Sequence, residues 1–294
     1  MCKLMDNIYE EIFSEIYGYP VCNLNENNSR NIRDSIIKLR ASYRSNEPIT
    51  EYDKSSIRKA YMLAYYPNYM NLVYELVKLH IVDNLTNEAR RIKVVFFAAG
   101  PGPEVSGVLK GLNDSKFNKR LDINILDLEK GWEKERKVTS NIIKKLDNLK
   151  ISSLNHLSGC DLTVNCKQIC SNWVSCEKSI FQGDLYFMNN CINHMGSEVN
   201  FIENLRLKIS NLKQGAIFTI IDLDYENVRN TIRRLNNDCN DIVQVISTNI
   251  NSKISVSKLN VKLPNEISKY IFNNTKGLIA KKNTNYYYII LRRG

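Results

Sequence analysis

The first ninety residues carry apolar side chains at the spacing of α-helices. Isoleucines recur at every fourth position over residues 8–16, and a second set with helical spacing covers residues 32–39. A third helix is predicted to begin near Asp53 and to stop or kink at Pro67, because proline has no backbone N–H for the helical ladder. The pattern therefore predicts a helical N-terminal cap that comprises residues 1–90.

From residue 91 the pattern changes to short apolar runs that alternate with helix-compatible stretches. Such runs are typical of parallel strands, because helices cover both faces of the sheet. The sequence therefore predicts a doubly wound α/β domain with a mostly parallel sheet over residues 91–294. Strands are expected at 94–99, 121–127, 162–166, 184–189 and 216–222, with a pair at 242–246 and 286–291 that closes the sheet at its edge. Helices are expected up to residue 112, over 132–149 and 198–212, and through residue 234.

Composition sets limits on the class of protein. Of the 294 residues, 43% are hydrophobic and 24% are charged, values that are typical of a globular chain with a buried core. No apolar run approaches the roughly 20 residues that span a bilayer. The N-terminus turns acidic at Asp6, too early for a secretory signal. A cytoplasmic protein without a membrane segment is therefore expected, and its eight cysteines are expected to be mostly reduced.

The most informative segment ends the first apolar run, where Gly100 and Gly102 flank a proline and a helix follows. Glycines allow a tight turn and the close approach of a ligand at the carboxyl end of a strand. A phosphate-binding P-loop is excluded, because Pro103 and Glu104 follow the loop instead of Lys and Ser or Thr. A dinucleotide site is disfavoured, because Val105 replaces its third small residue and Glu104 would repel a pyrophosphate. A ligand with an adenosine and a zwitterionic amino acid but no phosphate suits this loop better, and S-adenosylmethionine is such a ligand.

An acidic residue also ends the second predicted strand. Asp127 follows Gly102 by 25 residues, where a carboxylate can accept both ribose hydroxyls. Trp132, just beyond it, is placed to lie against an adenine. The alternative for Asp127 is an ordinary cap at the start of the next helix.

At these positions the chain resembles the class I S-adenosylmethionine-dependent methyltransferases, from about residue 91 to the C-terminus. The resemblance rests on residues 98–102 (AAGPG) in the glycine-rich first motif and residues 126–128 (LDL) in the second. Residues 184–190 (DLYFMNN) fall in the fourth-strand motif, and the tyrosine-rich last strand fits the closing hairpin of the family. The resemblance implies a seven-stranded sheet with the cofactor above strands one, two and four.

Two departures from the family pattern concern the methionine end of that cofactor. Phe96 stands where the family usually has an acidic residue, and Ala98 stands where its first glycine often lies. Contacts to the methionine amine are therefore expected from Glu104 or from backbone carbonyls near Ala99. The residues expected to bind the cofactor are Ala99, Gly100, Gly102, Glu104, Asp127 and Asn189.

Enzymes of this family hold the methyl acceptor at the end of the fourth strand, here residues 188–194. The Asn/Asp-Pro-Pro-aromatic motif of amino-methylating enzymes is absent, which argues against adenine-N6, cytosine-N4 and glutamine methylation through that motif. Methyl transfer depends on positioning more than on a strong catalyst. The expected catalytic residues are His194, as a general base, and Asn190. The alternatives are a structural His194 and a Cys191 that is simply a packed apolar side chain.

Four tyrosines surround Pro67 at the end of the helical cap, at positions 61, 65, 66 and 69. Aromatic rings at this place can cover a cofactor or stack on an acceptor, and Tyr65 and Tyr66 are the residues expected to bind substrate. At helical spacing, packing between the cap and the sheet is the competing interpretation.

Cysteines also form a cluster, at positions 160, 166, 170 and 176. A zinc or iron–sulfur site would use such thiols, with His156 as a spare ligand. The spacing lacks the paired C-x2-C units of structural zinc sites, so no metal is expected.

The chain carries a net charge of +10, most of it near the C-terminus. From Asn249 onward there are nine basic residues and one acidic residue, Glu266. Such a region attracts phosphate-rich partners, although a solvated lysine-rich surface is an equal alternative. The sequence thus predicts a methyltransferase that acts on a small molecule or on structured RNA. The competing prediction is a catalytically silent binding protein with the same fold.

Overall fold

The computed structural model describes seven stretches of the chain. They are residues 7–43, 51–85, 90–128, 131–158, 182–192, 199–251 and 255–294.

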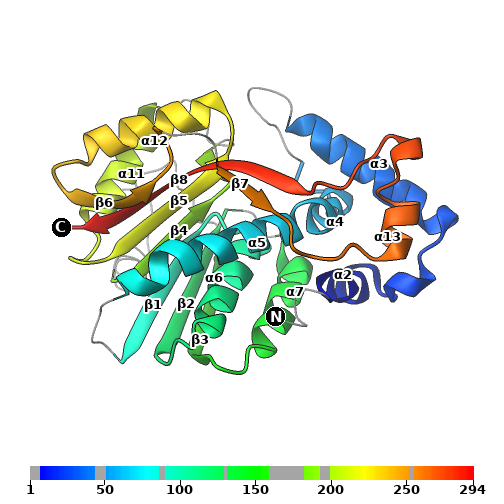
Figure 1. Ribbon diagram of the computed structural model, residues 1–294, viewed down its shortest axis with the longest axis horizontal. Helices are drawn as coiled ribbons and strands as arrows, with labels where there is room; N and C mark the ends of the chain where they lie inside the picture. The colour runs from blue at the N-terminus through cyan, green and yellow to red at the C-terminus, as the bar shows by residue number, and fades with distance from the viewer. Residues whose placement is uncertain are drawn as a thin grey trace.

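An eight-stranded sheet forms the centre of the described structure (Figure 1). Its strands follow the order β3-β2-β1-β4-β5-β8-β6, and β7 pairs with β8 beside this path. Strands β1 to β5 are parallel, whereas β8 is antiparallel to β5, β6 and β7. The prediction of a doubly wound, mostly parallel sheet is confirmed, with eight strands in place of seven. The strands are β1 Arg91–Phe97, β2 Arg120–Asp127, β3 Lys150–Ser158, β4 Leu185–Asn189, β5 Ile217–Leu223, β6 Val243–Thr248, β7 Ser255–Lys258 and β8 Asn283–Arg293.

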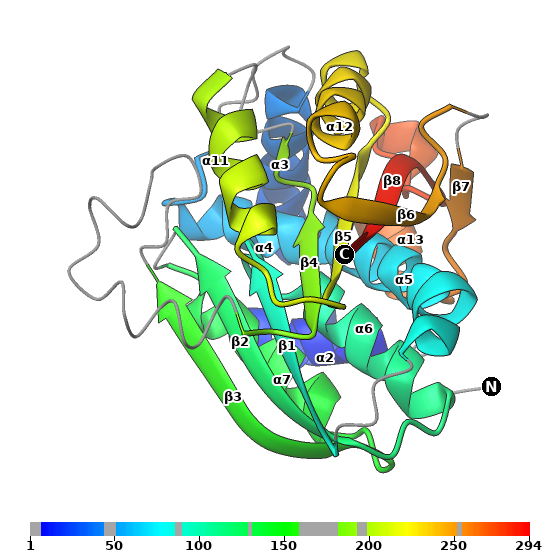
Figure 2. The same ribbon diagram turned by 90° about the vertical axis from the view of Figure 1, so that its left-hand side faces the viewer.

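Helices cover both faces of the sheet, as the apolar strands require (Figure 2). Alternate residues of β1 point to opposite faces, so that Val94 and Phe96 pack in one core while Val95 and Phe97 pack in the other. The first core is covered by α5 (Tyr66–Leu76), α6 (Pro103–Asp114) and the last turn of α7 (Glu133–Lys144). The second is covered by α11 (Val199–Ser210) and α12 (Glu226–Asp238).

One prediction about the elements around the sheet needs correction. The helix expected over 132–149 ends at Lys144, and β3 follows it at the edge of the sheet. No residue over 150–157 is fully buried, so this strand lacks the continuous apolar run that marks the inner strands. The two C-terminal strands were expected as an edge pair that closes the sheet, and this is confirmed, because β8 and β6 pair with each other and are the last two strands at one end. The strand expected at 162–166 lies outside the described residues.

The helical cap shares its core with a distant part of the chain. Its helices are α2 (Ile8–Ile12), η1 (Phe13–Tyr17), η2 (Val21–Asn23), α3 (Glu26–Ser42) and α4 (Ser55–Ala64). Buried residues of these helices form one apolar cluster with residues 261–278, a segment that contains α13 (Asn265–Tyr270) and η6 (Asn274–Lys276). The cap is therefore built from both ends of the chain.

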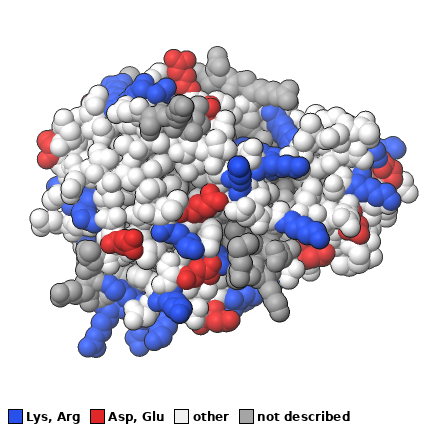
Figure 3. Space-filling view, viewed as in Figure 1, with Lys and Arg blue, Asp and Glu red and all other residues white. Residues whose placement is uncertain are grey.

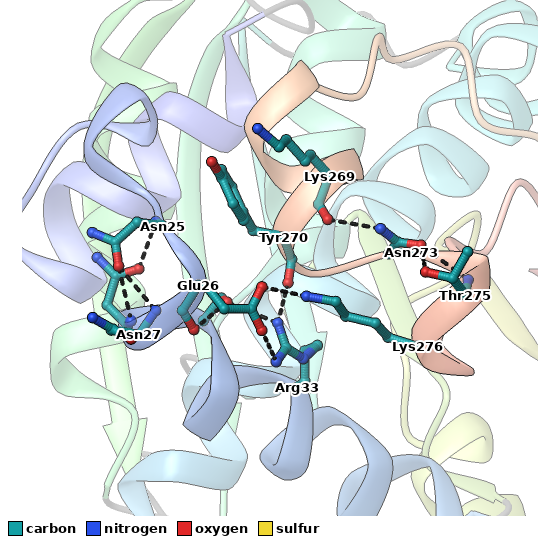
Figure 4. A network of polar contacts seen from close by, with 11 residues as sticks. Asn25, Glu26, Asn27, Arg33, Lys269, Tyr270, Asn273, Thr275 and Lys276 are labelled. Carbon is teal, nitrogen blue, oxygen red and sulfur yellow. Dashed lines mark hydrogen bonds and ion pairs between the residues drawn. The ribbon is translucent and has the colours of Figure 1, made fainter.

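Polar contacts on the surface of the cap join the same two segments (Figure 4). The Glu26 carboxylate pairs with the Arg33 guanidinium at 2.7 Å and with Lys276. Arg33 also donates through Nη1 to the backbone carbonyl of Tyr270, at 2.6 Å. Helix α5 belongs to both cores, because Tyr66, Tyr69 and Met70 pack in the cap cluster whereas its later residues pack under the sheet. Beyond it, η3 (Val77–Ile81) and η4 (Val82–Asn84) line the sheet. The boundary at residue 90 stays a prediction.

Candidate functional site

The glycine loop lies between β1 and α6, at the carboxyl edge of the sheet. Ala98, Gly100 and Gly102 all have positive φ angles, of 52°, 51° and 86°. The left-handed region favours glycine, so the two glycines satisfy what this turn requires and Ala98 carries strain. The Gly100 N–H donates to Asp127 Oδ2 at 2.6 Å, which ties the loop to the end of β2. The first two predicted cofactor elements are therefore joined by a direct hydrogen bond.

Helix α7 fixes the loop from the other side. Arg136 Nε donates to the Gly100 carbonyl at 2.9 Å, and Thr139 Oγ1 donates to the Pro101 carbonyl at 2.5 Å. The indole of Trp132 lies against the loop, 3.4 Å from the position that a Cβ on Gly100 would take. These contacts preorganise the loop, and the sequence reasoning did not single out Arg136. From the sequence alone, a buried arginine in an amphipathic helix looks like an exposed one, because the carbonyl to which it bonds is not known.

Glu104 occupies the first turn of α6 in a buried position. It is 2% exposed, and its Oε1 atom has no hydrogen-bond partner among the described residues. Burial raises the pKa of this carboxyl well above its usual range, and the nearby Asp127 charge raises it further while Arg136 opposes the shift. Such a carboxyl is ready to receive a cationic or hydrogen-bond-donating ligand.

The end of β4 presents two more polar side chains, and the amide atoms of both are buried. Asn189 is 5% exposed, and Asn190 has a φ angle of 53°. Neither amide has a hydrogen-bond partner for its oxygen or its nitrogen among the described residues. Because a buried amide is expensive to leave unbonded, these two groups mark a place for a ligand. The predicted cofactor residue and the predicted catalytic residue thus lie side by side.

Asp222 shapes the turn that follows β4. This fully buried residue ends the apolar run of β5. Its carboxylate accepts the N–H groups of Ile192 at 2.8 Å and Leu223 at 2.7 Å. Cys191 is buried beside it, and burial raises the pKa of that thiol, as expected for a packed apolar cysteine. Asp222 was missed from the sequence, although an acid that closes a buried strand is the same signal that marked Asp127.

An aromatic cluster, defined as Tyr43, Tyr52, Tyr61, Tyr65, Tyr69 and Trp132, lies between the cap and the glycine loop. Trp132 packs against Tyr52 and Tyr61 at ring-centroid distances of 5.2 and 5.7 Å. Tyr65 stacks on Tyr69 at 5.6 Å. The charge of Glu104 contributes to the raised pKa of Tyr61, and the charge of Asp222 contributes to that of Tyr69, although burial is the main cause of both shifts. The cluster therefore reaches both the glycine loop and the carboxyl end of β5.

Tyr66 has a different position from its neighbour Tyr65. It is fully buried, and its hydroxyl lies 2.6 Å from the hydroxyls of both Ser106 and Thr139. This arrangement joins the first residue of α5 to α6 and α7 beside the glycine loop. The hydroxyl is already bonded on two sides, so the contacts of Tyr66 are those of a residue that holds the loop in place. Of the predicted pair, only Tyr65 belongs to the aromatic cluster.

Several predicted groups are not placed by the described structure. His194 and the four clustered cysteines lie outside the described residues, whereas His156 lies on the edge strand β3. Within the described residues, no group of three potential metal-binding side chains comes together. The described helices include none that is both long and apolar enough to cross a membrane.

The basic residues near the C-terminus are spread over the molecule. Arg292 and Arg293 end β8, at the opposite end of the molecule from α13 (Figure 1). Arg292 bonds to Asn84, and Lys276 pairs with Glu26. On the face drawn in Figure 3, acidic side chains lie among the basic ones. The charge surplus therefore does not form one continuous surface on this face.

No protein-family model matches the sequence, and no curated protein sequence is significantly similar to it. Solved structures with a similar arrangement include a Listeria monocytogenes protein described as a class I S-adenosylmethionine-dependent methyltransferase. It is 11% identical, with a TM-score of 0.45 over 99% of this chain and 80% of that one. The plantazolicin methyltransferase BpumL, solved with S-adenosylhomocysteine, is 11% identical, with a TM-score of 0.43 over 90% of this chain and 99% of that one. A Methanosarcina mazei S-adenosylmethionine-dependent methyltransferase is 10% identical, with a TM-score of 0.42 over 72% and 96% of the two chains.

The likeness to these methyltransferases concerns the fold alone. Any assignment of chemistry has to come from the residues at the carboxyl edge of the sheet, where the glycine loop, Asp127, Glu104 and the two asparagines meet.

Proposed function

We propose that this protein is an S-adenosylmethionine-dependent methyltransferase. The observation that carries the proposal is the group of buried polar atoms without partners around the glycine loop, contributed by Glu104, Asn189 and Asn190. They lie at the ends of β1 and β4, the edge where open α/β sheets bind ligands. The strand order, with one antiparallel strand inserted between β5 and β6, agrees with this proposal.

The residues present fit the cofactor group by group. Asp127 accepts one N–H from Gly100, and a carboxylate has lone pairs for further donors, such as ribose hydroxyls. Glu104, in the first turn of the helix that follows the loop, would receive the methionine ammonium, a role that the apolar Phe96 cannot take. The Asn189 amide would bond to the adenosine or methionine polar groups. S-adenosylmethionine supplies an electrophilic methyl group, and the protein supplies its orientation.

The acceptor would lie at the end of β4, beside Asn190 and beneath the aromatic cluster. Asn190 would orient the acceptor atom through its amide, and His194 is proposed to accept the proton that the acceptor loses. A small molecule is favoured over structured RNA, because several of the C-terminal basic residues serve contacts within the chain and are scattered over the molecule.

Calorimetric titration with S-adenosylhomocysteine and S-adenosylmethionine tests the cofactor site. Micromolar binding is expected for the unmodified protein, and Asp127→Ala should weaken it at least tenfold. Asp122→Ala is the matched control, because Asp122 lies on the same strand but near its amino end, where it pairs with Arg91. Equal affinity of both variants, or no binding by a folded protein, would contradict the proposal.

Methyl transfer separates the enzyme from a catalytically silent binding protein. The protein would be incubated with cofactor labelled in its methyl group and with small-molecule or RNA fractions of a cell extract. Label is expected in a small-molecule product, and Asn190→Ala should reduce its formation without weakening cofactor binding. Cofactor binding without transfer to either fraction would favour the silent alternative.

A further inference from the structure

Lys281 lies in the segment between η6 and β8, and its ammonium group contacts the aromatic cluster. Its Nζ atom is 5.5 Å from the ring centroid of Tyr65 and 5.8 Å from that of Tyr69. The two rings are nearly parallel, with 21° between their planes. A cation held over two tyrosine faces is a favourable arrangement, and here it places a positive charge on the aromatic cluster.

The charge of Lys281 has no carboxylate to balance it among the described residues. Every lysine in the described ion pairs lies within 4.0 Å of an acid, and Lys281 is not one of them. The nearest charged influence is the Arg40 guanidinium, which has the same sign. Burial and that neighbour lower the pKa of Lys281 to about 8. A partly buried cation in this state gains free energy from an anionic ligand.

The Tyr69 hydroxyl provides a second group without a partner. Tyr69 is fully buried, and its hydroxyl oxygen has no hydrogen-bond partner among the described residues. Tyr69 shares its buried cluster with Leu223, the β5 residue that follows Asp222. Tyr69 therefore joins two donors, its own buried hydroxyl and the Lys281 ammonium that lies over its ring.

From this juxtaposition we infer that the methyl acceptor carries an anionic group, a carboxylate or a phosphate, that binds Lys281 and the Tyr69 hydroxyl. The face of Tyr65 packs against the apolar part of the same molecule. This inference rests on the proposed methyltransferase function and adds the substrate class to it. Lys281 would then bind the acceptor in addition to packing over the aromatic rings.

The test uses small probes of known charge on the full chain saturated with S-adenosylhomocysteine. Benzoate, phenyl phosphate and benzylamine are titrated by calorimetry, so that carboxylate, phosphate and ammonium are compared on one ring. At least one of the two anions is expected to bind, at least tenfold more tightly than benzylamine. The stronger of the two identifies the anionic group.

Variants locate the binding site of the probe. Lys281→Gln should weaken the anion at least tenfold, Lys281→Arg should largely retain it, and Tyr69→Phe should weaken it several-fold. Lys282→Gln is the matched control, because Lys282 is adjacent and exposed, and it should change the affinity by less than twofold. Unchanged affinity for S-adenosylhomocysteine shows that each variant is folded.

Three results would overturn the inference. They are equal anion affinity in Lys281→Gln and Lys282→Gln, preferential binding of benzylamine, and binding of no probe to the loaded protein. A protein that fails to bind S-adenosylhomocysteine would refute the proposed function instead. The same probes titrated on that unloaded protein would still decide whether an anion binds at Lys281.

Discussion

Replacement of Gly102 by alanine tests whether the glycine loop is shaped for a ligand or is merely a turn. Gly102 has a φ angle of 86°, and an added Cβ would lie 3.2 Å from the side chains of Thr139 and Val105. Gly215 provides a matched control, because its φ angle is 79° and an added Cβ there would meet nothing within 4 Å. Both variants suffer the same backbone strain, and only Gly102→Ala also disturbs the loop.

The expected magnitudes follow from these two contributions. A non-glycine residue in the left-handed region costs about 1–2 kcal/mol, and the smaller entropy of the unfolded alanine chain offsets about 0.4–1 kcal/mol of this. Gly215→Ala should therefore lose about 1 kcal/mol of unfolding free energy. Crowding of a packed site adds about 1–3 kcal/mol, so Gly102→Ala should lose about 2–4 kcal/mol. The difference between the two variants isolates the packing of the loop against α7.

Urea unfolding followed by circular dichroism measures the stability difference, and calorimetry measures the affinity for S-adenosylhomocysteine. Gly102→Ala should weaken that affinity at least tenfold, because Thr139 and the Pro101 carbonyl that it bonds must shift. Gly215→Ala should leave the affinity unchanged. Equal stability losses in the two variants, together with equal affinities, would refute the view that this loop is held in a binding conformation by α7.

Three further predictions concern the surroundings of the loop. Tyr66→Phe removes a hydroxyl bonded on two sides and should cost about 1–3 kcal/mol of unfolding free energy, as measured in urea. Glu104→Gln should stabilise the unloaded protein at pH 8 but not at pH 4, as thermal melts at both values would show. Because the pKa of Glu104 is raised in the folded state, the native protein loses stability as the pH rises above the pKa that this carboxyl has in the unfolded chain. Ile271→Ala, in the part of the cap core supplied by the C-terminal segment, should cost about 2–5 kcal/mol, against less than about 0.5 kcal/mol for the exposed Ile279→Ala. Equal losses of unfolding free energy in Ile271→Ala and Ile279→Ala would contradict a core that the cap shares with the C-terminal segment.

The sheet and the glycine loop could be predicted because their signals are local. A short, mostly apolar run that ends in glycine, an acid or an asparagine marks an inner strand and its carboxyl end, and this pattern located β1, β2, β4 and β5. The loop residues Gly100 and Gly102 and the strand-end residue Asp127 were identified in the same way. The hydrogen bond between Gly100 and Asp127 confirms that these two signals meet in space.

The remaining features depend on contacts between distant parts of the chain. The edge strand β3 has an apolar residue only at every third position, so its pattern is not that of a strand and is shared with surface helices and loops. Tyr65 and Tyr66 are adjacent in sequence, yet one belongs to the aromatic cluster and the other bonds to Ser106 and Thr139. Lys281 had no distinguishing pattern among the basic residues near the C-terminus, and only its place over two tyrosine rings separates it from Lys282.

A comparison between asparagines in the same sheet shows why the end of β4 calls for a ligand. Asn249, which follows β6, is 4% exposed, and its amide donates to the Tyr286 carbonyl at 2.9 Å and accepts the Tyr288 N–H at 2.7 Å. Asn189 is buried to the same degree, but neither its amide nor that of Asn190 has a partner within the described residues. Each unsatisfied buried group costs about 1–3 kcal/mol, so the four amide atoms destabilise the unloaded fold at one place. Among the described residues, the buried Asn249 is satisfied by the sheet, whereas the amides of Asn189 and Asn190, near Glu104 and the glycine loop, are not. A bound molecule that bonds to these groups would recover that free energy, and this is the physical reason to expect a polar ligand at this edge of the sheet.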